Sequence, residues 1–453
     1  MTAFWTMRRV ASALGTGPVS DVPLRAVSTD TRSVQRGDLF VALAGERFDA
    51  HEFLADAVAK GASAVVVASA RRAAGLGVPV FEVADTLAAL GALGRYRRRA
   101  WGRPVIAVGG SNGKTSTKEL IRAALSARLV VHATDGNLNN QVGVPLTLLA
   151  IPDDADIAVI EAGTNRPGEI ALLRDIVEPD LVVVTTVQEE HLEGFGDLAG
   201  VMREEAALLD GAPVAIVPAG EAALTAEAHA RARRTIGAGL PPAHGLHANG
   251  AGWLELDGVR VEVPLRGLHN LRNAMLALAA ARECGLQLPD AAAGIGRLDL
   301  RAVPSMRSAV DALGDALIIN DAYNANPASA RAALDLLASV AGRRQRVVVL
   351  GSMRELGAQT ERAHREVARS ALDSGAHVIA GIGDFATALR ALAPRDARVL
   401  TAPDIDALWP QLRARLAADA AILLKASRGV RLERLLPQLA AWASDAVSPY
   451  LEG

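Results

Sequence analysis

Residues 110–115 read GSNGKT and lie between an apolar run, PVIAV, and a helical pattern. A glycine-rich turn at the start of a helix binds phosphate, because its backbone N–H groups and the helix N-terminus attract anions. Lys114 would place an ammonium group on the β- and γ-phosphates, and the Thr115 hydroxyl would bind Mg²⁺. A glycine-rich turn without a ligand is the alternative, but the order strand, loop, helix favours a phosphate loop. Its spacing, G-x-x-G-K-T, is shorter than the common G-x-x-x-x-G-K-[ST] form.

Lysine is scarce in this chain, which makes its positions informative. It occurs only at Lys60, Lys114, Lys118 and Lys425, and the other 44 of the 48 basic residues are arginine. A codon preference explains the arginine. The positions that keep lysine are then candidates for sites where a compact ammonium is needed rather than a planar guanidinium.

Two further polar residues follow apolar runs of the strand type. Glu161 ends DIAVIE, and His191 follows DLVVVTTV. Ligands of parallel sheets gather at the carboxyl ends of the strands. A carboxylate and an imidazole there can bind Mg²⁺ or hold a water molecule beside a phosphate. Either residue alone would more often be structural, but beside a phosphate loop the metal role is favoured.

The surrounding elements predict an α/β fold with parallel sheets. From Pro104 onward, runs of valine and isoleucine alternate with helical segments, which is typical of a parallel sheet covered on both faces. The same alternation returns near ALIINDAY and continues to AAILLKAS, which predicts a second, smaller doubly wound domain. Residues 1–85 read as a small α/β unit. We predict domains at 1–85, 86–303 (with a linking helix at 86–103) and 304–453.

The composition excludes several classes of protein. The chain has 453 residues and a net charge of −2, so no strong field would gather nucleic acid or an anionic membrane. The RYRRR of the linking helix is expected to be a solvated helix face rather than a nucleic-acid patch. No signal peptide or membrane span is predicted, and we expect a cytoplasmic monomer. The single cysteine, Cys284, is expected to be a small core residue.

Several longer motifs together resemble the Mur ligases, the ATP-dependent amide ligases that build the peptide of bacterial peptidoglycan. These are FDAHEF from Phe48, GNLNNQVGVPLTLL from Gly136, HLEGFG from His191, DAYNANPAS from Asp321 and KASRGVRLE from Lys425. The resemblance extends nearly from end to end, and the short phosphate loop belongs to the family. Within the family, the motifs are most similar to those of the members that add D-alanyl-D-alanine.

The resemblance implies three domains: one that binds the uridine diphosphate of the substrate, a central ATPase with a P-loop, and a mobile C-terminal Rossmann-like domain. It also implies the reaction. The terminal carboxylate of UDP-N-acetylmuramoyl-tripeptide attacks the γ-phosphate of ATP to give an acyl phosphate, and the amine of D-alanyl-D-alanine then displaces phosphate. Mg²⁺ and Lys114 would offset the negative charge of this reaction.

The resemblance also assigns site residues, which fall into groups by the part of the ligand that they are expected to contact. The phosphate loop comprises Gly110, Ser111, Asn112, Gly113, Lys114, Thr115 and Ser116. The expected adenine and ribose contacts are His269, Asn270, Asn273, Asp321 and Tyr323, and Arg307 is expected at the γ-phosphate. The expected contacts of the dipeptide side are Asn324, Asn326, Lys425, Ser427 and Arg428. The expected contacts of the uridine diphosphate and muramoyl parts are Thr31, Arg32, Asp49, His51, Asn137, Asn139 and Asn140. Helix capping and turn formation are the alternative roles for the asparagines.

Two positions depart from the family pattern. Gly109 stands where the family usually has threonine, and Glu205 stands where most Mur ligases have a lysine whose carbamate binds the second Mg²⁺. Glu205 already carries a carboxylate, so we predict that it meets the metal without carbon dioxide. The metal residues are then Thr115, Glu161, His191 and Glu205, and a surface position on a helix is the alternative for Glu205.

Two other functions remain open from the sequence. One is a neighbouring amino-acid ligase, either another Mur type or a folylpolyglutamate type, and the motifs DAYNANPAS and FDAHEF stand against it. The other is a nucleotide-gated binding protein that has lost ligation, an option that the missing lysine keeps open.

Overall fold

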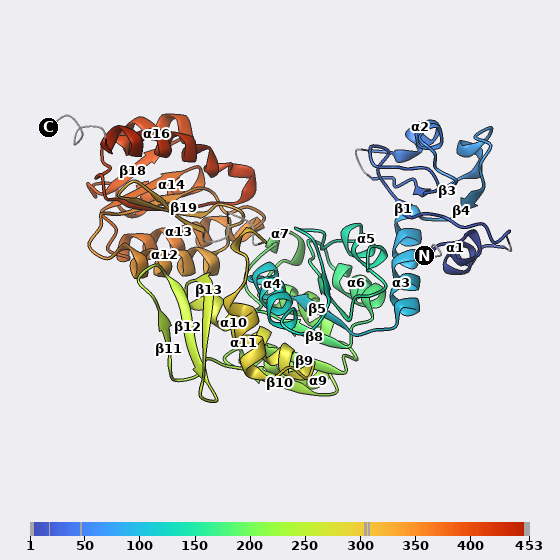
Figure 1. Ribbon diagram of the computed structural model, residues 1–453. Coiled ribbons are helices and arrows are strands. Elements are labelled where there is room, and N and C mark those ends of the chain that lie inside the picture. The colour runs from blue at the N-terminus through green and yellow to red at the C-terminus, as the bar shows by residue number, and fades with distance from the viewer. Residues whose placement is uncertain (1–3, 18, 46–47, 303–305, 307–308, 448–453) are drawn as a thin grey trace. The chain divides into compact units, whose positions relative to one another are not determined.

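The computed structural model describes residues 4–17, 19–45, 48–302, 306 and 309–447 (Figure 1). Packing divides the chain into two compact units. The first unit contains Met1–Ala107, His132–Gly163 and Glu169–Asp180, and the second contains Val108–Val131, Thr164–Gly168 and Leu181–Gly453. These two units differ in their residue ranges from the three domains predicted from the sequence. The predicted domain boundaries stay a prediction.

The first unit begins with a parallel sheet in the order β1-β2-β3-β4. Its strands are short and apolar, and alternate residues enter different cores: Leu39 and Val41 pack on one face and Phe40 on the other. The elements of this part are α1 (Met7–Leu14), β1 (Val27–Ser28), β2 (Leu39–Val41), α2 (Leu54–Ala59), β3 (Ala64–Val67) and β4 (Val80–Glu82).

The predicted linking helix is α3 (Thr86–Trp101), which begins after Asp85 and ends at Gly102 in a left-handed conformation. The expected solvated face of RYRRR is wrong for Arg97 and Arg98, which are buried. Their guanidinium groups are paired with acidic side chains and backbone carbonyls of the same unit. The first unit also contains α5 (Gly143–Leu149), β7 (Ile157–Glu161) and α6 (Glu169–Val177).

The central sheet has six strands in the order β10-β9-β8-β5-β7-β6. The predicted apolar runs form β5 (Val105–Gly109), β7, β8 (Leu181–Val184) and β9 (Val214–Pro218), and the buried pattern of β5, β7 and β8 matches their continuous apolar sequence. The remaining elements are β6 (Val131–Ala133), α4 (Lys114–Leu125), α7 (Leu192–Phe195), α8 (Leu198–Ala206), α9 (Ala222–Arg231), β10 (Thr235–Ala238), α10 (Leu268–Glu283) and α11 (Leu288–Gly296).

A three-stranded antiparallel sheet, β11-β12-β13, follows the central sheet and was not predicted. It comprises β11 (His244–Leu246), β12 (Ala251–Leu256) and β13 (Val259–Arg266), and lies beside α10 and α11 in the ribbon (Figure 1). Helix α10 begins directly after β13, so this hairpin fixes the point from which α10 starts.

The C-terminal sheet has the order β14-β15-β19-β16-β17-β18, with only β14 antiparallel to its neighbour. One apolar core of this sheet is built from alternate strand residues, which share one face, and from the helices that cover that face. The elements are β14 (Ala309–Leu313), β15 (Ala316–Asp321), α12 (Pro327–Ala341), β16 (Arg346–Leu350), α13 (Thr360–Asp373), β17 (Val378–Ile382), α14 (Asp384–Leu392), β18 (Val399–Ala402), α15 (Ile405–Arg413), β19 (Ala421–Lys425) and α16 (Leu436–Val447).

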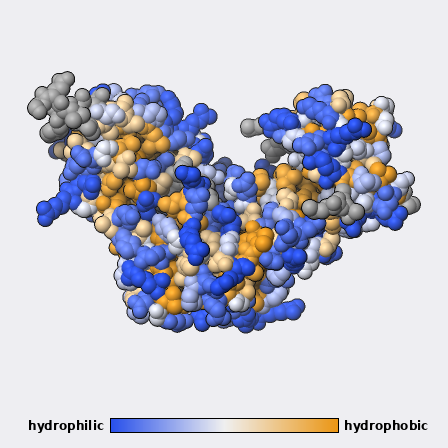
Figure 2. Space-filling model, in the orientation of Figure 1, coloured by the Kyte–Doolittle hydropathy of each residue, from blue (hydrophilic) through white to orange (hydrophobic). Residues whose placement is uncertain are grey.

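The surface mixes hydrophilic and hydrophobic residues over the face drawn in Figure 2. Within the described ranges, no helix has the length and apolar character needed to cross a membrane.

Cys284 directly follows α10 and is half-buried rather than enclosed in the core. Burial raises the pKa of its thiol to about 11, so it is a poor nucleophile at neutral pH.

Candidate functional site

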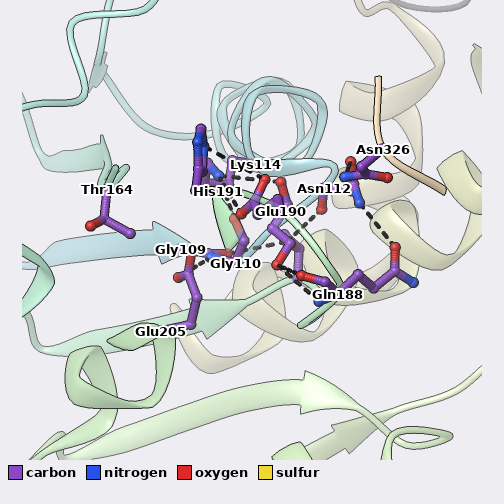
Figure 3. A network of polar contacts seen from close by, with 12 residues as sticks. Gly109, Gly110, Asn112, Lys114, Thr164, Gln188, Glu190, His191, Glu205 and Asn326 are labelled. Atoms are coloured by element: carbon purple, nitrogen blue, oxygen red, sulfur yellow. Dashed lines mark hydrogen bonds and ion pairs between the residues drawn. The ribbon is translucent and has the colours of Figure 1, made fainter. Parts of the chain in front are cut away.

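The phosphate loop is the turn that joins β5 to α4 (Figure 3). Gly110 has φ 113° and Gly113 has φ 85°, both in the left-handed region that favours glycine. A Cβ atom on Gly110 would lie 2.4 Å from the hydroxyl oxygen of Thr185. One on Gly113 would lie 2.8 Å from the amide oxygen of Asn273. Gly110 is therefore required by close packing against backbone atoms of residues 185–186 as well as by conformation, and Gly113 by conformation.

A segment after β8 holds the loop in shape. The Ser111 N–H donates to the Thr186 carbonyl at 2.7 Å, and the Thr185 hydroxyl donates to the Asn112 carbonyl at 2.6 Å. The Asn112 side chain donates to the Gln188 side chain at 2.9 Å. This segment, residues 185–188, carries no motif of its own that would mark it from the sequence.

Lys114 begins α4, and its side chain is only 14% exposed. Its ammonium donates to the Gly110 carbonyl and lies 3.8 Å from a carboxylate oxygen of Glu190. Thr115 and Ser116 follow in the buried first turn of the helix. Glu190 is 5% exposed, and burial raises the pKa of its carboxyl group. A buried acid beside the phosphate-loop lysine was missed by the sequence analysis.

His191 lies next to Glu190 and contacts the C-terminal region. Its Nδ1 is hydrogen-bonded to Glu355, and its Nε2 lies 4.0 Å from Glu190. Burial would lower the pKa of His191, but the hydrogen bond with Glu355 and the charge of Glu190 raise it above the ordinary value. His191 and Glu355 both have positive φ, 49° and 64°, which is unfavourable for residues with a side chain.

Two more contacts join the same parts of the second unit. The Glu193 N–H donates to the Glu355 carbonyl at 3.0 Å, and Arg362 is paired with Glu189 at 2.7 Å. The loop that carries His191 is thus held by both the side chain and the backbone of Glu355.

A cavity of about 500 Å³ opens beside the phosphate loop within the second unit. It brings together ten residues predicted to contact nucleotide or dipeptide: Asn112, Gly113, Ser116, His269, Asn270, Asn273, Asp321, Tyr323, Asn324 and Lys425. Its lining also includes residues that the sequence analysis did not propose: Thr185, Thr186, Gln188, Pro218, Glu221, Arg272, Ala328, Ser329, Arg331, Ala332 and Asp335.

Four of the cavity residues, His269, Asn270, Arg272 and Asn273, come from the first turns of α10. The Asn273 amide donates to the Asn270 side chain at 3.0 Å, and Asn270 donates to the Arg266 carbonyl at 2.8 Å. Burial lowers the pKa of His269, so this imidazole is neutral near pH 7. The two amides form a small network at the helix start and lie on the cavity wall. The N-cap of α10 is Gly267, so helix capping, the alternative role considered for these asparagines, is not theirs.

Asp321 and Lys425 meet at the ends of β15 and β19. The Lys425 ammonium lies 2.5 Å from the Asp321 carboxylate and donates to the Asn324 carbonyl at 2.8 Å. Lys425 is 3% exposed, so the ion pair is nearly enclosed. Tyr323 lies on the cavity wall, and the Arg428 guanidinium is 6.0 Å from its ring centre.

Asn326 and Ser427 are buried and engaged within the fold. Asn326 caps α12 by accepting from the Ser329 N–H at 2.8 Å, and its amide donates to Asn112 at 3.0 Å. The Ser427 hydroxyl accepts from the Arg354 N–H at 2.9 Å. Arg307, predicted at the γ-phosphate, lies outside the described residues.

Glu161 belongs to the first unit, where it ends β7 and is 1% exposed. One of its carboxylate oxygens accepts from the Asn139 amide at 2.9 Å. Asn140 is exposed and accepts from the N–H groups of Val142 and Gly143, so it caps the start of α5. Asn137, also exposed, lies in the same loop.

The predicted uridine diphosphate residues also lie in the first unit. His51 is 5% exposed, and both of its ring nitrogens are engaged: Nδ1 with Asp49 at 2.6 Å and Nε2 with the Ala68 N–H at 2.9 Å. Because Nε2 accepts from a backbone N–H, the ring proton lies on Nδ1 and is donated to Asp49. Arg32 is paired with Asp30 in solvent, and Thr31 precedes it. The nucleotide role of these residues stays a prediction.

Glu205 lies in α8 and is fully buried. A surface position, the alternative considered above, is therefore excluded. One of its carboxylate oxygens accepts from the Gly110 N–H at 2.7 Å. Burial raises the pKa of Glu205 to about 7. The carboxylate therefore contacts the phosphate loop itself.

Three of the four predicted metal residues, Thr115, Glu161 and Glu205, offer the oxygen donors that Mg²⁺ prefers, and His191 offers a nitrogen. Mg²⁺ takes oxygen ligands, keeps several waters and usually binds through one or two carboxylates together with substrate phosphates. Thr115 and Glu161 supply a hydroxyl and a carboxylate. In the described part of the chain, no three His, Cys, Asp or Glu side chains converge into a metal-binding group of their own. This donor set suits a metal that arrives with a nucleotide.

The parallel sheet, the glycine-rich loop and the lysine at the start of α4 define the class of α/β proteins with a P-loop. Three family models match the chain: Mur ligase family, catalytic domain, over residues 23–98; Mur ligase middle domain over 108–281; and Mur ligase, glutamate ligase domain, over 306–428. The chain belongs to the Mur ligase family.

Relatives and solved structures match nearly the whole chain. Two proteins named UDP-N-acetylmuramoyl-tripeptide–D-alanyl-D-alanine ligase are similar to it. That of Escherichia coli (strain K12) is 35% identical, with 93% of this chain and 94% of that protein covered. That of Bacillus subtilis (strain 168) is 34% identical, with 92% and 93% covered. MurF from Acinetobacter baumannii matches with a TM-score of 0.87, 30% identity and coverage of 96% and 99%. MurF ligase from Thermotoga maritima in complex with ADP matches with a TM-score of 0.79, 25% identity and coverage of 93% and 98%. The fold is the three-domain Mur ligase architecture.

Proposed function

We propose that this chain is an ATP-dependent ligase that joins D-alanyl-D-alanine to the terminal carboxylate of UDP-N-acetylmuramoyl-tripeptide. The observation that carries the proposal is the cavity beside the phosphate loop. The wall of this cavity contains Asn112 and Gly113 of the phosphate loop, the Asn270 and Asn273 amides of α10, and Asp321 and Lys425. These are residues that the resemblance assigns to the nucleotide and the dipeptide. The names of the full-length relatives support the same substrates.

The phosphate loop supplies the electrostatics of the first step. A carboxylate and a triphosphate repel one another, so their reaction needs positive charge at the transferred phosphate. Lys114 at the start of α4 supplies that charge from a side chain that is mostly shielded from solvent. The N–H groups of the α4 N-terminus add a fixed positive potential in the same place.

The proposal assigns Mg²⁺ to Thr115, Glu161, His191 and Glu205. Bound there with ATP, the metal would neutralise phosphate charge and act as a Lewis acid. His191 is held through Nδ1 by Glu355, which leaves Nε2 for a ligand. This arrangement, a carboxylate on one imidazole nitrogen, is the one that commonly orients a metal-binding histidine.

The substrates divide between the two units in this proposal. Thr31, Arg32, Asp49, His51, Asn137, Asn139 and Asn140 are assigned to the uridine diphosphate and muramoyl parts. Asn324, Asn326, Lys425, Ser427 and Arg428 are assigned to the dipeptide side, with Arg307 at the γ-phosphate. Acyl phosphates react with water, so the C-terminal region is assigned the role of excluding it. The reaction is placed in the cytoplasm, and the working form is taken to be a monomer.

The test is the release of ADP from ATP and Mg²⁺ with UDP-N-acetylmuramoyl-tripeptide, in the presence and absence of D-alanyl-D-alanine. We expect ADP to accumulate only when both substrates are present, with one amide product per ADP. Full activity with D-glutamate or a diamino acid in place of the dipeptide would assign the chain to another amino-acid ligase. ATP binding without any ADP release would support a nucleotide-gated binding protein instead.

A further inference from the structure

Glu205 contacts the phosphate loop from the side of α8. Its carboxylate accepts a hydrogen bond from the Gly110 N–H at 2.7 Å, across 95 residues of sequence. Gly110 is the first residue of the loop, and its N–H points at Glu205 in this structure. A hydrogen bond from a backbone amide to a carboxylate is among the stronger ones in proteins, and leaving such an amide buried without an acceptor is unfavourable.

Gly109 lies directly against this contact. A Cβ atom on Gly109 would lie 2.6 Å from the Cδ2 atom of Leu208 and 3.3 Å from the Oε2 atom of Glu205. The first distance is a clash, and the second is tighter than most carbon–oxygen contacts. A side chain at position 109 would thus displace the Leu208 side chain and crowd the Glu205 carboxylate that accepts from the loop. Gly109 and Glu205, the two departures from the family pattern, meet at one contact.

The neighbouring acid holds a second loop. Glu204 accepts from the Gly168 N–H at 2.7 Å and from the Thr164 hydroxyl at 3.1 Å. Successive residues of an α-helix point about 100° apart, so adjacent acids reach different loops. The end of α8 therefore fixes residues 164–168 through Glu204 and the phosphate loop through Glu205.

We propose that Glu205 is a positioning residue that holds the phosphate loop in its binding shape through the Gly110 amide, independently of any metal. The inference rests on the proposed function, because it concerns nucleotide binding at the same loop. It differs from the metal role in one respect that can be measured. A positioning residue affects nucleotide affinity when no metal is present, whereas a metal ligand affects only the metal-dependent part.

The experiment measures ADP binding by calorimetry in EDTA, together with hydrogen exchange of the peptide that covers residues 106–116. Glu205→Ala should weaken metal-free ADP binding about tenfold and speed exchange at the loop, because the Gly110 amide loses its acceptor. Glu205→Gln keeps an oxygen that can accept, so it should stay within about threefold of the wild type. Arg203→Gln, at an exposed position on the same helix, is the matched control.

A second pair of variants covers the case in which Glu205→Ala does not fold. Gly109→Ala should also weaken metal-free ADP binding and speed loop exchange, and adding Leu208→Ala should restore part of both by making room for the new Cβ. Unchanged ADP binding and loop exchange in Glu205→Ala, with Mn²⁺ binding lowered equally in both Glu205 variants, would overturn the proposal. The exchange measurement needs no ligand, so it tests the contact even if the wild type fails as a ligase.

Discussion

Glu178 in the first unit and Glu205 in the second are the same residue type in opposite electrostatic settings. Glu178 is paired with Arg99 and Arg95, whose hydrogen bonds and charges lower its pKa to about 2. Glu205 is enclosed by α8 and the phosphate loop, and burial raises its pKa to about 7. The first acid is stabilised by its partners, while the second is held where ionisation is unfavourable.

The same contrast separates the polar residues around these two acids. In the first unit, His51 and Arg98 have their hydrogen-bonding groups engaged by neighbours in the fold. In the second unit, Glu190 lies buried near Lys114, and Glu205 has one oxygen without a hydrogen-bond partner among the described residues. Buried acids with raised pKa values in a cleft are typical of functional sites, whereas fully paired ones are typical of structural networks.

The largest effect is expected at the phosphate loop. Lys114→Arg should lower kcat about 100-fold or more, because a guanidinium is larger than the ammonium that fits between the Gly110 carbonyl and Glu190. ADP release under saturating substrates measures it. Lys60→Arg, at an exposed position of the first unit, is the matched control. Near-normal turnover in Lys114→Arg would show that the phosphate loop does not need a compact ammonium. The distinction between functional charges in the second unit and structural charges in the first would then fail at Lys114.

Glu355→Gln should raise the Mg²⁺ concentration needed for half-maximal activity about tenfold. The carboxylate is hydrogen-bonded to Nδ1 of His191. A carboxylate that orients a metal-binding histidine in this way typically changes metal affinity by about tenfold or more. A Mg²⁺ titration of activity, with Mn²⁺ binding followed by electron paramagnetic resonance, measures the effect. An unchanged metal requirement would show that the contact only joins two parts of the second unit. Glu361→Gln, an exposed position on α13, is the control.

Arg98→Ala should lower the free energy of unfolding by about 3 kcal/mol and leave KM for the nucleotide unchanged. Its guanidinium donates to the carbonyls of Val177 and Glu178 and is paired with Asp180, so truncation leaves buried acceptors without a donor. Urea unfolding of the purified protein measures the loss. A stable variant with impaired nucleotide binding would place function in a region that we interpret as structural.

The smallest effect concerns the pH dependence of stability at Glu178. Its pKa is lower in the folded chain than its ordinary value of 4.5, so its ion pairs stabilise the fold above pH 4.5 and lose this contribution as pH falls toward 2. Because the arginines are partly in solvent, the contribution is about 1 kcal/mol. The difference in unfolding free energy between the wild type and Glu178→Gln should therefore shrink by most of that amount between pH 6 and pH 2. A constant difference would contradict the paired state.

The sequence predicted the elements whose signals are local. The apolar runs of β5, β7 and β8, the phosphate loop and the helix α3 all follow from short patterns. Of the nucleotide residues, those at strand ends and helix starts, such as Asp321 and Asn273, lie on one cavity as expected.

The residues that the sequence did not reveal act through distant contacts. Glu355 meets His191 across 164 residues, and nothing in either local sequence indicates the pairing. Glu190 stands out only because the fold buries it beside Lys114. Arg97 and Arg98 read as a charged surface, but acids from other segments accompany them into the interior. Burial of a charge depends on its partner, and a partner far along the chain is invisible to a local pattern.

The side chain of Asn326 has a consequence that extends beyond capping. It closes the first turn of α12 with one atom and binds Asn112 of the phosphate loop with another. If nucleotide binding alters this contact, a second ligand that reorganises the α12 N-terminus is coupled to the nucleotide, and each ligand then changes the affinity of the other by the same factor. A molecule that binds only to the C-terminal region of the cavity would therefore act as an effector of the nucleotide without touching it.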